Sequence, residues 1–141
     1  MNREILFRAK AINRDERYET RTRYKNGDWV YGLVSRLGSE KYDIPMEMTN
    51  TDGTSGIDVD RKTVGQYTGL TDKNNVRIFE GDIIHGFGGN FAVRWSPEIC
   101  SFVAGEGRRI RPAMTYGTMR SFEVIGNIYD NPELMEDKEN E

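Results

Sequence analysis

Two carboxylates spaced two residues apart are the side chains most capable of chemistry. In "IFEGDIIH", Glu80 and Asp82 flank Gly81, and alternate residues of a strand share a face, so the two side chains could converge. Such a pair could act as general acid and base, or could bind a divalent cation. Acidic residues beside a turn glycine are ordinary, however, and no nucleophile or second carboxylate cluster stands next to them. We therefore interpret this stretch as a tight strand connection, and we predict no catalytic and no metal-binding residue.

Cysteine and histidine each occur once, as Cys100 and His85. One residue of each type cannot build a tetrahedral zinc site within a chain, and a Cys-His nucleophilic pair would need the two to be adjacent in the fold. The apolar strand neighbours of Cys100 predict a small buried hydrophobe instead. The glycine-rich stretch 86–90 lacks the Gly-Lys-Ser/Thr ending of a phosphate loop, which predicts a hairpin loop. We expect no cofactor and no enzymatic activity.

Basic residues form the remaining candidate site. Arg108, Arg109 and Arg111 lie close together in "RRIR", and residues 1–25 carry a further basic surplus. Small barrels often bind single-stranded nucleic acid, which makes this the alternative functional hypothesis. A net charge of −3 counts against it, and the acidic end from Asp130 onward could complement the basic residues within or between subunits.

Aromatic side chains could also stack on bases, but aromatics on strand faces are more often core residues. We therefore predict that Trp29, Trp95, Phe91 and Phe102 are core.

Hydrophobic alternation with a period of two recurs along the chain, which predicts a mainly β protein. Asn26-Gly27 favours a two-residue hairpin turn, after which Trp29, Tyr31 and Leu33 share a face. The segment 38–62 has loop composition, with a possible short edge strand around Tyr42, Ile44 and Met46. Short strands at close spacing then continue to residue 130, which indicates a small barrel or sandwich. Pro132 can begin one helical turn behind Asn131, which would act as its cap.

Length and composition set the organisation. The 141 residues suit one β domain over 1–132, with a variable insertion at about 38–62, a barrel core at about 63–130 and an acidic tail at 133–141. A hydrophobic fraction of only 36% indicates either much exposed loop or burial of apolar surface that other subunits complete. The lone cysteine fits a reducing compartment, and no apolar run is long enough to span a membrane. We expect a cytoplasmic protein that does not contact membranes.

Three blocks of the sequence resemble the YopX-like family of bacteriophage and prophage proteins. They are "REILFRA", "IDVDRKTVGQYTGLTDKNNVRIFEGDII" and "FEVIGNIYDNPEL", in the order and spacing typical of the family. Asn74-Asn75 replaces the usual Asn-Gly of the central turn and keeps access to positive φ, whereas Lys10 stands where an aromatic is common.

The resemblance implies a fold with an SH3-like barrel core, an origin in a phage or prophage of a bacterial host, and assembly into homo-oligomers. It supplies no catalytic residues, and fold alone does not imply an activity. We therefore predict an oligomeric module that binds host or phage proteins. The residues predicted to form its turns and core are Gly65, Tyr67, Gly69, Leu70, Asp72, Glu80, Gly81, Asp82, Gly126, Asn127 and Tyr129.

Overall fold

The computed structural model describes residues 3–12, 23–105 and 116–136. Contacts within this part of the chain divide it into two compact units, unit 1 from Met1 to Gln66 and unit 2 from Tyr67 to Glu141. The sequence suggests one domain with a core beginning at about residue 63, so the division falls close to that predicted start. Each unit has its own apolar core.

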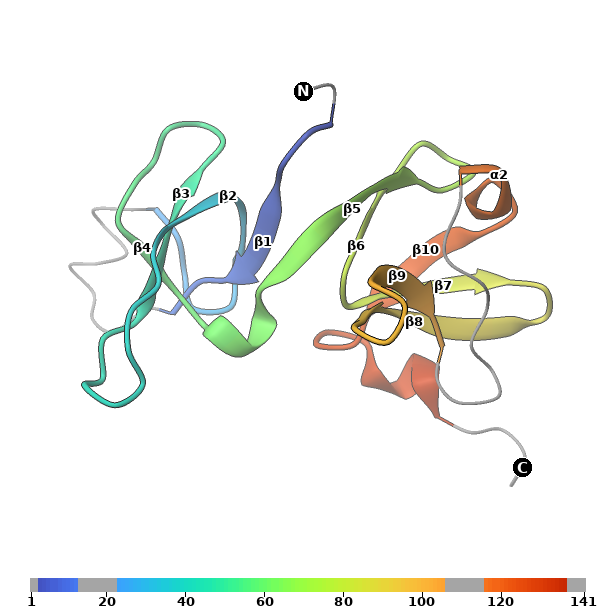
Figure 1. The fold of residues 1–141 in the computed structure, drawn as a ribbon. Coiled ribbons are helices and arrows are strands. Elements are labelled where there is room, and N and C mark those ends of the chain that lie inside the picture. The colour runs from blue at the N-terminus through green and yellow to red at the C-terminus, as the bar shows by residue number, and fades with distance from the viewer. Residues whose placement is uncertain (1–2, 13–22, 106–115, 137–141) are drawn as a thin grey trace. The chain divides into compact units, whose positions relative to one another are not determined.

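Strands and short helical turns follow one another along the chain (Figure 1). In unit 1 they are β1 (Phe7–Lys10), β2 (Trp29–Arg36), β3 (Met46–Asn50), β4 (Ile57–Val59) and the 3-10 turn η1 (Arg61–Thr63). Strand β5 (Gly65–Thr71) begins in unit 1 and ends in unit 2. Unit 2 continues with β6 (Arg77–Phe79), β7 (Asp82–Gly86), β8 (Gly89–Ser96), β9 (Ser101–Ala104), α2 (Tyr116–Met119), β10 (Glu123–Asn127) and η3 (Pro132–Met135).

The mainly β prediction is confirmed, because the strands form two antiparallel sheets. Their orders are β4-β3-β2-β1-β5-β6 and β10-β7-β8-β9, and neither sheet closes into a barrel within the described residues. The SH3-like core implied by the family resemblance stays a prediction. No described helix has the length and apolar character needed to cross a membrane.

Alternation along β2 sets the core of unit 1. Val30 is fully buried and packs with Ala9, Met48 and Val59, whereas Tyr31 and its neighbour Leu33 on the same face are exposed. Each fully buried aliphatic side chain of this size stabilises the fold by about 1.5–3 kcal/mol. The apolar face of the sheet therefore holds unit 1 together.

The turn at Asn26-Gly27 forms as predicted, but it does not join two strands. Gly27 has φ of +92°, and the Asp28 amide donates to the Lys25 carbonyl at 3.0 Å. The preceding residues 23–25 are not in a strand, and β2 pairs with β1 instead, with Phe7 opposite Gly32. The hairpin prediction is wrong because pairing with β1 supplies the hydrogen bonds of β2.

The segment 38–62 also differs from its loop prediction, since it contains β3 and β4. These two strands pair antiparallel, with Met48 opposite Ile57. Both side chains are fully buried. The strands are short, and the polar turn between them contains Gly53 at φ of +93°. Three of the segment's apolar residues, Met48, Ile57 and Val59, are buried, whereas Tyr42 and Ile44 are exposed.

The core of unit 2 centres on Phe122, which is fully buried. Ile84, Phe91, Val93 and Met119 lie in the same cluster. The Phe91 ring meets the Phe122 ring edge to face, with centroids 6.2 Å apart. Phe91 is the one of the four aromatics predicted as core that is buried in the structure.

Candidate functional site

A surface pocket of about 140 Å³ lies in unit 1. It is bounded by the turn of residues 39–44, by the start of β3 and by the end of β4 with η1. Its apolar lining consists of Ile12, Ile44, Pro45, Met46 and Val59, and its polar lining consists of Ser39, Glu40, Asp43, Asp60 and Arg61.

Backbone hydrogen bonds hold the turn beside the pocket in one conformation. Ser39 and Ile44 exchange two backbone bonds of 2.8 Å each, which closes a four-residue loop. Asp43 within that loop has φ of +52°, a region that aspartate adopts more readily than most residues. The pocket is therefore bordered by a short, closed turn.

Arg61 fastens this turn to η1. Its Nη2 donates to the Ile44 carbonyl at 3.1 Å, and its Nε lies 3.6 Å from the Glu40 carboxylate. On the same 3-10 turn, the Asp60 carboxylate caps the start by accepting the Lys62 amide at 3.0 Å. These side-chain contacts, together with the chain itself, hold the 39–44 turn next to η1.

The chemistry of the pocket suits an apolar side chain better than an ion. Its lining combines aliphatic groups with a rim of three carboxylates and one guanidinium. Within the described ranges, no group of three or more His, Cys, Asp or Glu residues is arranged to hold a metal. A lining that mixes aliphatic and charged groups is compatible with a protein interface.

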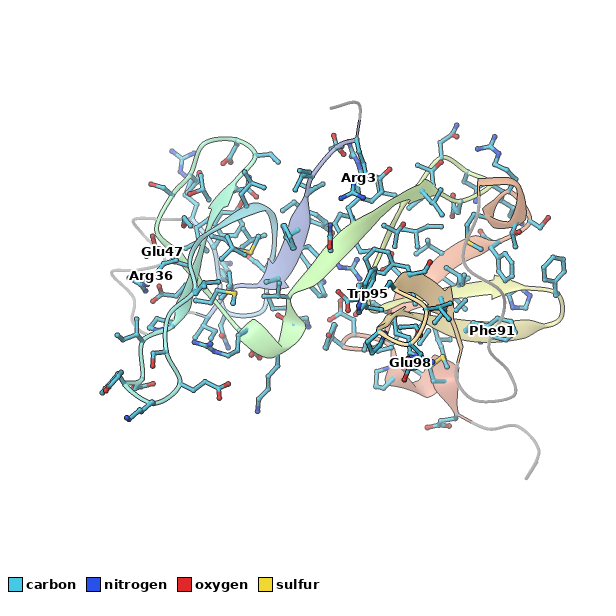
Figure 2. The ribbon with its side chains drawn as sticks, in the orientation of Figure 1. Arg3, Arg36, Glu47, Phe91, Trp95 and Glu98 are labelled. Carbon is cyan, nitrogen blue, oxygen red and sulfur yellow. The ribbon has the colours of Figure 1, made fainter. Side chains whose placement is uncertain are left out.

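An ion-pair cluster lies on neighbouring strands of the same unit (Figure 2). Arg36 Nη1 of β2 lies 3.3 Å from the Glu47 carboxylate of β3, and its Nη2 lies 3.5 Å from the Asp58 carboxylate of β4. The Arg36 side chain is 45% exposed. Ion pairs this exposed contribute little, so the cluster links three strands without forming a site.

Glu80 and Asp82 lie at a tight connection between β6 and β7. Asp82 is 2% exposed, and its Oδ2 accepts the Phe79 amide at 2.7 Å. Gly81 has φ of +92°; its amide donates to the Val93 carbonyl, and its carbonyl accepts the Ile128 amide. Glu80 precedes this glycine and is half-buried. The geometry here is that of a turn fastened to two neighbouring segments.

Asp72 accepts three backbone hydrogen bonds. The side chain is completely buried, and its Oδ1 accepts the amides of Asn74 at 2.8 Å and Val76 at 3.0 Å. Its Oδ2 accepts the Val124 amide of β10 at 2.9 Å. Asn75, in the same turn, has φ of +62°. One carboxylate thus shapes the β5–β6 connection and joins it to β10.

The remaining residues of the central block lie in or beside β5. Gly65 begins the strand, the Tyr67 ring lies 5.6 Å from the Phe79 ring, and Leu70 packs against the core of unit 2. Gly69 has φ of +88°, within the stretch where the register of β5 and β6 shifts.

The third block that resembles the family, "FEVIGNIYDNPEL", contains a network of asparagine side chains at the end of β10 and just after it. Asn127 Oδ1 accepts the amides of Tyr129 at 3.0 Å and Asp130 at 2.9 Å. Asn131 Oδ1 accepts the Asn127 amide at 3.2 Å and makes no capping bond to η3. The prediction that the Asn131 side chain caps this turn is therefore wrong. Gly126 is required beside it, because an added Cβ would lie 2.5 Å from Asn131 Oδ1. The helical turn that begins at Pro132 forms as predicted.

Two predictions for β8 and the turn that follows it are wrong. Cys100 is exposed rather than buried, because the turn of residues 97–100 places it at φ of +52°. Trp95 is 45% exposed rather than core, although its ring meets Phe102 edge to face at 5.1 Å. Alternation along the strand breaks there, since the next residue, Ser96, is buried.

His85 lies at the surface, Trp29 lies partly buried, and the arginines of the alternative hypothesis lie elsewhere in the chain. His85 is exposed, and its Nδ1 lies 2.7 Å from Asn90 Oδ1. The alternative nucleic-acid contacts Arg108, Arg109 and Arg111 lie outside the described residues. Trp29 is half-buried, with the Arg8 guanidinium 4.7 Å from its ring.

An aromatic residue at a hairpin tip is a feature that the sequence interpretation missed. Gly86 and Gly89 pair across β7 and β8, so the loop consists of Phe87 at φ of +49° and Gly88 at φ of +80°. Phe87 is 62% exposed. The letters "GFGG" contain the signal, because a phenylalanine occupies a turn position that normally favours Asn, Asp or Gly.

Comparison with known proteins identifies the chain at the level of a family. The model of the YopX protein family matches residues 7–136. No curated protein sequence matches at a significant level. The crystal structure of protein EF1440 from Enterococcus faecalis is similar, with a TM-score of 0.56 and 23% sequence identity over 96% of this chain and 100% of that chain. At this identity the structural likeness shows the fold alone.

Proposed function

Because the chain belongs to the YopX family, we propose that it is a non-enzymatic interaction module that forms homo-oligomers and binds other proteins. In this proposal a phage or prophage encodes it, it acts as an accessory protein in the bacterial host cytoplasm, and its central block forms part of an SH3-like core.

The observation that supports the proposal is the exposure of large apolar side chains in and next to the 39–44 turn, which borders the pocket of unit 1. Leu37 is 72% exposed, Tyr42 is 69% exposed, and Ile44, which also lines the pocket, is 41% exposed. Large exposed apolar side chains in one short segment offer apolar surface to a protein partner. The closed 39–44 loop is already ordered, so binding there loses little conformational freedom.

The experiment is the molar mass in solution, measured by size-exclusion chromatography with light scattering at micromolar concentration. We expect a mass above the 16.2 kDa of one chain. Tyr42→Ser should lower this mass or raise the concentration needed to assemble, because it removes apolar area at the proposed surface. Val76→Ser is the matched control, since Val76 is 46% exposed at a turn of unit 2. A lone monomer at these concentrations would overturn the proposal.

Nucleic-acid binding is the second candidate, and one observation favours it. Lys10 Nζ lies 5.5 Å from the ring of half-buried Trp29, which brings a cation and an aromatic together as single-strand binding surfaces do. Binding of this kind weakens steeply as salt rises, in proportion to the phosphates contacted. Fluorescence anisotropy with a labelled oligonucleotide at low salt would show no change if this candidate is incorrect.

A further inference from the structure

We infer that Phe87 of one copy inserts into the unit 1 pocket of a second copy, so that this head-to-tail contact joins the subunits. The inference rests on the proposed self-association and names the two surfaces that carry it. The knob is the tip of the β7–β8 hairpin, Phe87-Gly88, and the hole is the 140 Å³ pocket bounded by the 39–44 loop and η1.

The backbone at the hairpin tip disfavours phenylalanine. A φ of +49° at Phe87 lies in the left-handed region, which is sterically unfavourable for a residue with a Cβ. Asn or Gly would form the same two-residue turn at lower cost. A strained residue that is also 62% exposed is a candidate for function, because strain at a surface position is retained where the side chain serves another purpose.

The Phe87 side chain is only partly buried within unit 2. Its ring meets Phe122 edge to face, with centroids 5.0 Å apart. The residue is nevertheless 62% exposed, and burying this apolar surface in a partner would add stabilisation.

The pocket has the size and lining for a phenyl ring. Its volume of about 140 Å³ is close to that of engineered apolar cavities of about 150 Å³ that bind benzene. Ile12, Ile44, Pro45 and Met46 supply apolar contacts, and the lining also includes the charged residues Glu40, Asp43, Asp60 and Arg61. Aromatic anchors seated in apolar pockets with polar rims are the usual hot spots of interfaces.

A knob and a hole on different parts of one chain make a heterologous contact. Such contacts repeat from copy to copy and produce closed rings or open chains, unlike the self-complementary face of a two-fold dimer. This property allows a test by complementation. One copy that lacks only the knob and another that lacks only the hole can still form a single contact with each other.

The test uses the full chain with Phe87→Asn and, separately, Ile44→Glu. Asn suits the turn, so F87N should keep or raise the melting temperature while the molar mass by light scattering falls. I44E adds a charge to the pocket wall and should also lower the mass. An equimolar mixture of the two variants should form a 1:1 pair that neither forms alone. Val76→Asn is the control, and it should leave the wild-type mass unchanged.

Each outcome decides the inference. Recovery of the pair in the mixture supports it. If the wild-type chain is oligomeric and F87N retains the same mass, the inference is overturned and the proposed self-association stands. If the mixture stays unpaired, the inference is overturned at any melting temperature, and an F87N protein that melts lower than wild type would then show that Phe87 serves to cover Phe122. A monomeric wild-type chain overturns both proposals.

Discussion

Replacing Asp72 by asparagine should destabilise unit 2 by removing one particular hydrogen bond. The buried carboxylate accepts three backbone amides, two on Oδ1 from Asn74 and Val76 and one on Oδ2 from Val124. An asparagine amide has one acceptor oxygen and one NH₂ group. Keeping two bonds is better than keeping one, so the oxygen should face Asn74 and Val76, and the NH₂ group should face the Val124 amide.

The cost follows from leaving that amide without an acceptor. An unsatisfied buried donor costs about 1–3 kcal/mol, and hydrogen bonds to a charged group, which Asp72 makes and asparagine does not, contribute about 1.5–3 kcal/mol each. Relief of the desolvation of a buried charge acts in the opposite direction. All three hydrogen bonds of Asp72 go to backbone amides that remain in the variant. We therefore expect the lost hydrogen-bond energy to exceed the relieved desolvation cost, so that D72N lowers the free energy of unfolding by about 2–3 kcal/mol. D72A removes all three acceptors and should cost more.

Urea denaturation measures the free energy of unfolding, and amide hydrogen exchange locates the loss. In D72N, the Val124 amide should exchange much faster while the Asn74 and Val76 amides stay protected. Asp52→Asn is the control, because Asp52 is exposed and accepts one turn amide, from Thr54 at 2.9 Å; its stability should change little. A D72N protein as stable as wild type, or with unchanged exchange at Val124, would refute the reasoning.

Two further substitutions test the turns of unit 2. Gly126→Ala should lower stability by about 1–3 kcal/mol, because the new methyl group would lie 2.5 Å from Asn131 Oδ1. Gly117→Ala is the control and should not lower stability, because its methyl group meets open space. Thermal unfolding of both variants measures the difference. The hydroxyl of Ser96 holds the pKa of the Glu98 carboxyl below its usual range, with a hydrogen bond of 2.8 Å. Ser96→Ala should raise that pKa, and an NMR titration measures it. This hydrogen bond stabilises the protein above the usual pKa of Glu98, and the stabilisation is lost as pH falls through the lowered pKa. A difference in stability between wild type and the variant that persists below the lowered pKa would contradict the assignment.

Turn geometry within a few residues could be predicted from the sequence. Asn74-Asn75 and Glu80-Gly81-Asp82 indicate positive φ by residue type alone, and Asn75 and Gly81 adopt it at +62° and +92°. The β class also follows from alternation. What the sequence does not reveal is that Asp72 reaches Val124, 52 residues away, because a carboxylate in a turn looks the same whether it faces water or another strand.

Burial was predicted poorly where a strand ends. Alternation in "NFAVRWS" places Phe91, Val93 and Trp95 on one face, yet Trp95 is exposed and Ser96 is buried. Period-two patterns assume a regular strand, and β8 ends at Ser96, where the turn to β9 begins. The same turn carries Cys100 outward. A residue type such as cysteine gives a preference for burial, but the path of the chain decides it.

The pocket of unit 1 illustrates why a binding surface is harder to predict than a core. Its lining comes from Ile12, from residues 39–46 and from residues 59–61, and each segment alone has ordinary loop or strand composition. They meet because β4 pairs with β3, with Val59 opposite Met46, and because Arg61 bonds to Ile44. A one-residue slip of that register would turn Val59 to the other face of the sheet. The hollow is therefore a product of strand register, and only a pattern that fixes register, such as the buried Met48 opposite Ile57, could have indicated it in advance.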